Sequence, residues 1–148
     1  MLTSFRELRV WREAMSLVKD IYCFVKGFPP EEKFGLASQL TRAAVSVPSN
    51  IAEGYGRGSR KDYVHFLHQA RGSIYEVETQ IEIAIALGYV ENNDHLRRRL
   101  CDVSKMLNFL IKRLEVNQGH EIKSRGAMSQ TLESGTLNPS SETLSPRP

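Results

Sequence analysis

The densest cluster of residues able to do chemistry in this 148-residue chain contains two of its four histidines. His65 and His68 lie three residues apart, and Asp62 precedes His65 in an acid-x-x-His step. A di-iron site in a helical bundle needs two Glu-x-x-His pairs and two further inward carboxylates. Glu76 and Glu82 have no matching histidines, and the histidines suggest no Ser-His-Asp arrangement. We therefore predict no metal site, no cofactor and no catalytic residues.

The two cysteines, Cys23 and Cys101, are far apart and form no C-x-x-C pair. This spacing predicts neither a disulfide framework nor a structural zinc site. Both fall within apolar helical segments, where we expect ordinary core thiols.

A glycine-rich segment, residues 54–61, brings three cations to the start of a predicted helix. It reads GYGRGSRK and matches neither the G-x-G-x-x-G fingerprint nor the Walker pattern. Glycines between helices usually cap and connect them. However, Arg57, Arg60 and Lys61 would lie where free amides and the helix dipole favour anions. A phosphate site and a plain solvated turn both remain open.

A second basic set, Arg98, Lys105 and Lys112, repeats every seven residues. The three side chains should share one outward line, opposite a stripe of leucines. Repeated around an oligomer, they would form a positive surface for a phosphate backbone, binding by charge and shape. Exposed aromatic residues beside the line would support stacking with single-stranded RNA, although the sequence alone identifies none. The alternative for each cation is a solvated helix face.

Four apolar stripes with spacings of three and four residues predict the helices that position these residues. The stripes consist of Leu8, Trp11, Met15, Val18, Tyr22 and Val25; Leu36, Leu40, Ala43, Val47, Ile51 and Tyr55; Tyr63, Phe66, Ala70, Ile74, Val77, Ile81 and Ala84; and Leu96, Leu100, Val103, Leu107, Leu110 and Leu114. Capping boxes at Ser4–Glu7 and Ser59–Asp62 mark two helix starts. No stretch shows sustained period-two alternation, so we predict an all-α fold, an antiparallel up-down-up-down four-helix bundle.

Pro48 falls inside the second stripe, where proline removes an amide donor and crowds the preceding turn. Because the stripe continues in phase across it, we predict a kinked helix rather than a break. Ser46, Ser49 and Asn50 are placed to satisfy the freed carbonyl or hold a water. The functional alternative is a polar pocket at the kink, formed by Asn50 and Glu53.

The run around this proline, QLTRAAVSVPSNIAEGYGR at residues 39–57, resembles the signature of the four-helix-bundle proteins encoded in intervening sequences of bacterial 23S ribosomal RNA genes. The segments FRELRVW, YVHFL, ARGS, EVETQ and ALGY are also similar to that family. The resemblance covers residues 4–115. It implies the same bundle fold, assembly into a homopentamer and no established enzymatic activity. A distant relative, the accessory variability protein of diversity-generating retroelements, is a basic pentameric bundle that binds nucleic acid and a reverse transcriptase.

The charge of the chain divides it into two parts. Residues 1–117 carry the whole net charge of +3 and form the predicted bundle. Residues 118–148 are neutral and polar, and their isolated apolar residues predict a disordered C-terminal tail. The charged start does not resemble a signal peptide, and no run approaches the ~20 apolar residues of a membrane span. We therefore expect a cytoplasmic protein without a membrane partner.

Helices one and two carry more apolar residues than one bundle seam needs, which indicates a second apolar surface. The extra residues are Phe5, Val10, Ile21 and Phe24 in the first helix and Ala44, Val45 and Ala52 in the second. The leading hypothesis is a non-enzymatic homopentamer that binds RNA or DNA through a basic surface. The alternative is a scaffold for a protein partner, a reverse transcriptase or another protein, with no nucleic-acid role.

Overall fold

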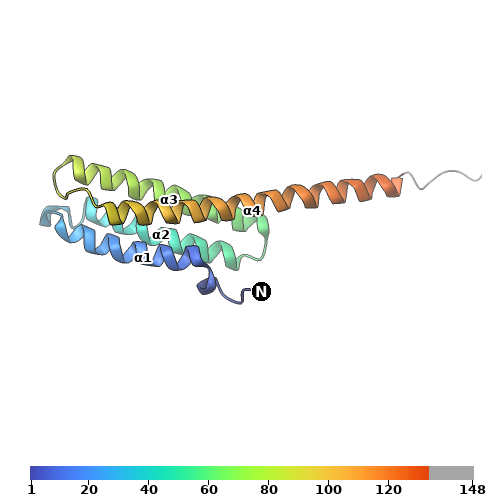
Figure 1. The fold of residues 1–148 in the computed structure, drawn as a ribbon, viewed down its shortest axis with the longest axis horizontal. Coiled ribbons are helices and arrows are strands. Elements are labelled where there is room, and N and C mark those ends of the chain that lie inside the picture. Colours follow the sequence, from blue (N-terminus) through green and yellow to red (C-terminus); the bar gives the residue numbers. More distant parts are fainter. Residues whose placement is uncertain (134–148) are drawn as a thin grey trace, which may run out of the picture. The chain divides into compact units, whose positions relative to one another are not determined.

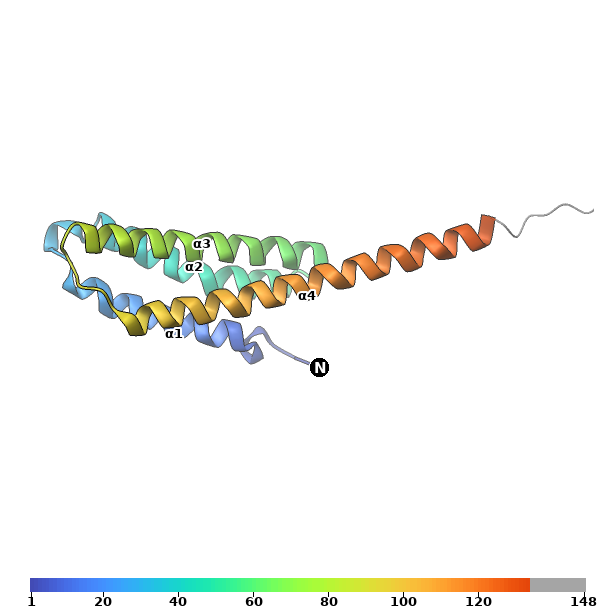
Figure 2. The same cartoon turned by 45° about the horizontal axis from the view of Figure 1, so that its top comes forward.

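The computed structural model describes residues 1–133, and these are helical apart from short connections. Four α-helices are present: α1 (Arg9–Phe24), α2 (Leu36–Gly56), α3 (Arg60–Ala86) and α4 (Asp94–Glu133). Short 3₁₀ turns, η1 (Phe5–Glu7), η2 (Val25–Gly27) and η3 (Pro30–Glu32), precede and follow α1. The described residues contain no strand, which confirms the predicted all-α class, and Figures 1 and 2 show the four packed helices. The up-down order of the helices stays a prediction.

Local signals set the helix ends. The predicted capping box of α3 is present, since the Asp62 amide donates to Ser59 Oγ at 3.1 Å. At the other end of α3, Gly88 adopts a positive φ of 74°, and the Gly88 and Tyr89 amides donate to the Ile85 and Ala84 carbonyls. This pattern is a Schellman motif, which requires a residue such as glycine that tolerates the left-handed region. Ser4 caps η1 rather than α1, and Glu7 accepts from Thr3.

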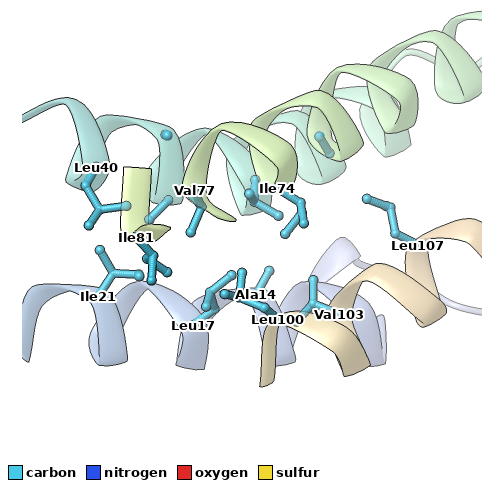
Figure 3. Packing of buried hydrophobic residues seen from close by; sticks show 14 of the residues in the cluster. Ala14, Leu17, Ile21, Leu40, Ile74, Val77, Ile81, Leu100, Val103 and Leu107 are labelled. Atoms are coloured by element: carbon cyan, nitrogen blue, oxygen red, sulfur yellow. The ribbon is translucent and has the colours of Figure 1, made fainter. Parts of the chain in front are cut away.

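The core lies among all four helices. Figure 3 shows Leu17 and Ile21 of α1 and Leu107 of α4 pointing toward Ile74 and Ile81 of α3. These side chains are at most 4% exposed, so the core is apolar and closely packed. In α4 the buried stripe follows the prediction from Leu96 to Leu107 and then moves to Ile111, with Leu110 and Leu114 half-buried.

The first predicted stripe is only partly confirmed, since four of its residues pack against the core from half-buried positions: Leu8, Trp11, Val18 and Val25. The core residues of α1 are Val10, Ala14, Leu17 and Ile21, whereas Met15 and Tyr22 of the predicted stripe are exposed. The helix carries two apolar stripes offset by about one residue, and the small side chain of Ala14 allows the closer approach to its neighbours. Consequently Val10 and Ile21, and Ala44 in α2, belong to the core rather than to a second surface.

Helix α2 continues through Pro48, as predicted, from Leu36 to Gly56. Around the proline, Ser49 Oγ donates to the Val45 carbonyl at 2.8 Å, and Asn50 Nδ2 donates to the Ser46 carbonyl at 2.8 Å. Ser46 Oγ lies 2.9 Å from the Ala43 carbonyl oxygen. The three side chains therefore bond to carbonyls near that of Ala44, and the prediction that they satisfy the carbonyl freed by Pro48 is wrong. The angle of a kink at this position stays a prediction.

The chain divides into two compact units, Met1–Glu115 and the residues from Val116 onward. Residues 118–133, which were predicted to be disordered, are instead the last part of α4. Good helix formers such as Glu, Lys, Arg and Ala prolong an existing helix without a new nucleation step, even where few apolar residues can be buried. The rest of the predicted tail, residues 134–148, lies outside the described residues.

Candidate nucleic-acid interface

The predicted basic line on α4 is exposed in the structure. Arg98, Lys105 and Lys112 all face solvent, on the side of the helix opposite Leu100 and Leu107, which are at most 3% exposed. Successive members lie about 10.5 Å apart along the axis, because seven residues each rise 1.5 Å. Buried leucines fix the rotation of the helix, and the three cations therefore form a permanent outward row.

The neighbouring arginines do not join this row. Arg99 turns toward α1, where its Nε lies 2.5 Å from Asp20 Oδ2 and its Nη1 lies 3.3 Å from Glu13 Oε2. Arg97 pairs with Glu82 of α3 at 2.6 Å. Arg99 therefore joins α4 to α1 and Arg97 joins α4 to α3, and Arg98 is the member of the triplet that lies on the basic line.

An aromatic residue that sequence reasoning missed lies within the row. Phe109 is 68% exposed, and it follows Lys105 by four residues and precedes Lys112 by three. Residues at these spacings are neighbours on one helix surface. The spacing of Phe109 from the two lysines can be taken from the sequence. The outward direction of its ring depends on the rotation of α4, which the buried residues Leu107 and Ile111 set.

The glycine-rich turn is built differently from a phosphate cradle. Arg57 Nη2 pairs with Glu53 Oε1 at 2.9 Å, and its guanidinium lies 5.0 Å from the Phe66 ring centroid. Arg60 is half-buried, and Lys61 is exposed. Of the three predicted cations, Arg57 is therefore paired with Glu53, and Arg60 is half-buried. Lys61 faces outward and has no described ion pair.

Gly54 and Gly58 have structural explanations. A Cβ at Gly54 would lie 2.8 Å from Phe66 Cβ and 3.1 Å from the Tyr63 carbonyl oxygen, so this glycine allows α2 and α3 to approach closely. Gly58 adopts a positive φ of 79° in the turn itself. Burial at the same contact raises the pKa of Tyr63 to about 12, with a smaller contribution from Tyr55.

The polar residues first considered for catalysis serve helix packing. His68 contacts Glu115 Oε1 through Nε2 at 3.1 Å and accepts from Arg71 through Nδ1 at 2.9 Å. Asn50 hydrogen-bonds within α2 and Glu53 pairs with Arg57, so both side chains have partners near Pro48. The polar pocket at the kink stays an alternative prediction.

Within residues 1–133, no three His, Cys, Asp or Glu side chains are grouped as a metal site would require, and no helix has the length and apolarity of a membrane span. The expectation for the cysteines is wrong, since Cys23 and Cys101 are both exposed. They lie within helices but off the buried stripes, which pass through Ile21 and Leu100 instead.

A comparison with known protein families shows which family the chain belongs to. Residues 6–109 match the family described as 23S rRNA-intervening sequence protein. The chain belongs to this family. The resemblance seen in the proline-centred motif is therefore confirmed, and the description of the family names no enzymatic activity.

A solved structure is also similar to this family member. It is a crystal structure of a protein with unknown function from the S23 ribosomal protein family of Bacteroides thetaiotaomicron. The two are 24% identical, with a TM-score of 0.64 over 70% of this chain and 95% of the other. The likeness concerns the fold alone. No curated protein matches the chain.

Proposed function

We propose that this family member is a non-catalytic, homo-oligomeric bundle that binds the phosphate backbone of RNA or DNA through the basic line on α4. The observation that carries the proposal is the exposed row of Arg98, Lys105 and Lys112 on a helix whose opposite side is fixed in the core. Backbone phosphates release counterions when such cations approach them, which provides affinity without base reading.

The turn between α2 and α3 has a secondary role in this proposal. Lys61 is exposed at the first turn of α3, where the helix dipole favours a phosphate. Arg57 would have to leave Glu53, and Arg60 is half-buried, so we assign the main contacts to α4. A net charge of +3 per chain limits the affinity of one subunit, and an oligomer would multiply the surface.

The test is a salt titration of binding to fluorescent single-stranded RNA and to duplex DNA. Lys105→Ala and Lys112→Ala should each weaken binding and reduce the slope of log K against log salt by about 0.7 for single strands and about 0.9 for duplex DNA. Lys33→Ala is the matched control, because Lys33 is an exposed lysine on the connection that precedes α2. No binding by the unaltered protein at low salt would overturn the nucleic-acid role.

Two apolar faces support self-assembly. Most of the residues that were predicted to form a second apolar surface are not part of them. On α1, Met15 and Tyr22 are exposed, with Trp11 and Val18 half-buried beside them. On α3, Tyr75 and Ile83 are exposed, as is Leu87 directly after the last residue of the helix; Tyr75 is 54% accessible. Of the predicted second surface, only Val45 is exposed. Soluble bundles rarely leave such stripes uncovered.

The charges beside these faces are complementary. Exposed Arg12, Lys19 and Lys26 repeat every seven residues beside the α1 face. Exposed Glu76 lies beside the α3 face, and Glu82, also exposed, lies on its other side and pairs with Arg97 of the same chain. A contact between the α1 face of one copy and the α3 face of the next therefore brings opposite charges together, and contacts between unlike faces can close into rings.

The subunit number in this proposal, five, comes from the family resemblance. Light scattering at several concentrations tests it, since a homopentamer has five times the chain mass of 16.8 kDa. The alternative function, a scaffold for a protein partner such as a reverse transcriptase, rests on the same apolar faces. It would be favoured by a monomer that binds no nucleic acid at low salt.

A further inference from the structure

We propose that Phe109 is a base-stacking residue within the basic line of α4, so that the ligand is a single-stranded nucleic acid. This inference rests on the proposed nucleic-acid role and names the substrate class of the same surface. Phe109 is a large apolar side chain in an unusual position. Phe109 is 68% exposed, while Leu107 and Ile111 on either side of it are at most 2% exposed.

The rotation of α4 leaves Phe109 no place in the core. Leu107 and Ile111 pack in the apolar interior together with Val103, so turning the helix to bury the phenyl ring would expose these residues. Within residues 1–133, no aromatic ring contact or cation–π contact involving Phe109 is described. The ring therefore presents its surface outward, at a hydrophobic cost that a ligand would relieve.

The charges around the ring identify the ligand. Lys105 lies one turn before Phe109, and Lys112 and Arg113 lie one turn after it; all three are exposed. A nucleotide offers a planar base for the ring and phosphates on either side for these cations. Lys105 and Lys112 are about 10.5 Å apart along the helix axis, which leaves room for a base between phosphate contacts.

A duplex fits this arrangement less well. Paired bases stack on each other and present only their edges in the grooves, so a phenyl ring on a helix surface finds no free base face. An unpaired base can stack on the ring, and such stacking is tolerant of sequence. The arrangement therefore favours single strands over duplexes, with the cations contributing to both.

A second copy of the chain is a less suitable occupant for this patch. Two α4 faces meeting symmetrically would bring the Lys105, Lys112 and Arg113 sets of both copies together, and like charges across an interface are costly. Exposed Asp102 lies within the basic line, four residues after Arg98 and three before Lys105, whereas residues 103–113 around Phe109 contain no acidic residue. The charge complementarity of the patch points to a polyanion.

The experiment measures binding by fluorescence anisotropy with oligouridylate RNA of about 12 nucleotides, a length that spans a typical single-strand site. A hairpin duplex with the same label is the second probe. Phe109→Ala should weaken single-strand binding by about 5- to 150-fold, the equivalent of 1–3 kcal/mol of stacking per base, and leave duplex binding and the salt slope unchanged. Phe109→Trp should retain binding, and its fluorescence should be quenched by the oligonucleotide.

Phe34→Ala is the matched control, because Phe34 is an exposed phenylalanine in the connection between η3 and α2 and belongs to neither proposed surface. Circular dichroism and light scattering confirm that each variant keeps its fold and mass. Equal losses for single strand and duplex, a changed mass in Phe109→Ala, or no loss at all would overturn the stacking role. In the last case, intact salt-dependent binding by the unaltered protein would leave the proposed function standing, whereas its absence would remove both.

Discussion

Gly54 illustrates how one residue's size determines whether two helices can meet. Gly54 is buried in α2, and the space that a side chain would need is occupied by Phe66 and Tyr63 of α3. The glycines of residues 54–58 therefore have different reasons to be present. Gly54 serves packing, Gly58 serves the positive φ of the turn, and Gly56 has open space around it.

Gly54→Ala should destabilise the bundle. Its Cβ would lie 2.8 Å from Phe66 Cβ, a distance that forces α2 and α3 apart and costs about 1–3 kcal/mol of the free energy of unfolding. Gly56→Ala provides the comparison in the same helix. A Cβ there meets nothing within 4 Å, so reduced freedom of the unfolded chain should leave stability unchanged or raise it by up to about 1 kcal/mol. Urea unfolding measures both; equal effects of the two substitutions would show that the close contact is unimportant.

Phe109 shows what could and could not be read from residues alone. Its spacing from Lys105 and Lys112 is a sequence fact, but whether it points outward depends on the rotation of α4. The heptad pattern placed the buried stripe at Leu110, whereas an α-helix drifts by about 20° per heptad and buries Ile111 instead. The same drift contributes to leaving Phe109 exposed.

At the scale of elements, the four helices could be predicted from the sequence. The side of a helix that faces the core could be predicted where that helix has a single apolar stripe. In α1 two stripes compete, and alanine carries little hydrophobic signal although Ala14 lies fully buried at the contact. Helix length was underestimated in α4 because the prediction relied on burial, while residues 118–133 continue the helix by propensity.

Pro48 is the feature of α2 that the sequence indicates most clearly. We expect Pro48→Ala to straighten α2, because alanine restores the amide that can donate to the Ala44 carbonyl and removes the ring that crowds it. The nearby hydrogen bonds from Ser49 and Asn50 already satisfy other carbonyls, so the effect on local stability should be smaller than the effect on the helix axis and on assembly. A crystal structure of the variant and its mass by light scattering measure this. An unchanged axis with an unchanged mass would contradict the expectation.

At the scale of the whole molecule, surface chemistry divides among the helices. The α4 row presents cations around an aromatic ring, α1 presents an apolar stripe beside Arg12, Lys19 and Lys26, and α3 presents one beside Glu76. In the bundle α2 packs against both α1 and α3. The proposed assembly and the proposed ligand therefore use different faces, and a ring made through α1 and α3 would leave every α4 row available.

If the α1 face of one copy binds the α3 face of the next, two complementary variants should behave differently from variants of a symmetric contact between like faces. Tyr22→Glu places a negative charge on the α1 face, opposite the glutamates of α3, and Ile83→Lys places a positive charge on the α3 face, opposite the lysines of α1. Each variant alone should be a monomer of 16.8 kDa, because a chain with one damaged face cannot pair with copies of itself. In an equimolar mixture, the intact α1 face of one variant can bind the intact α3 face of the other, so a mixed dimer of twice that mass should form. Native mass spectrometry with one variant isotope-labelled distinguishes the mixed dimer from a homodimer. If α1 faces instead paired with α1 faces, Ile83→Lys alone would still form dimers and mixing would create no new species.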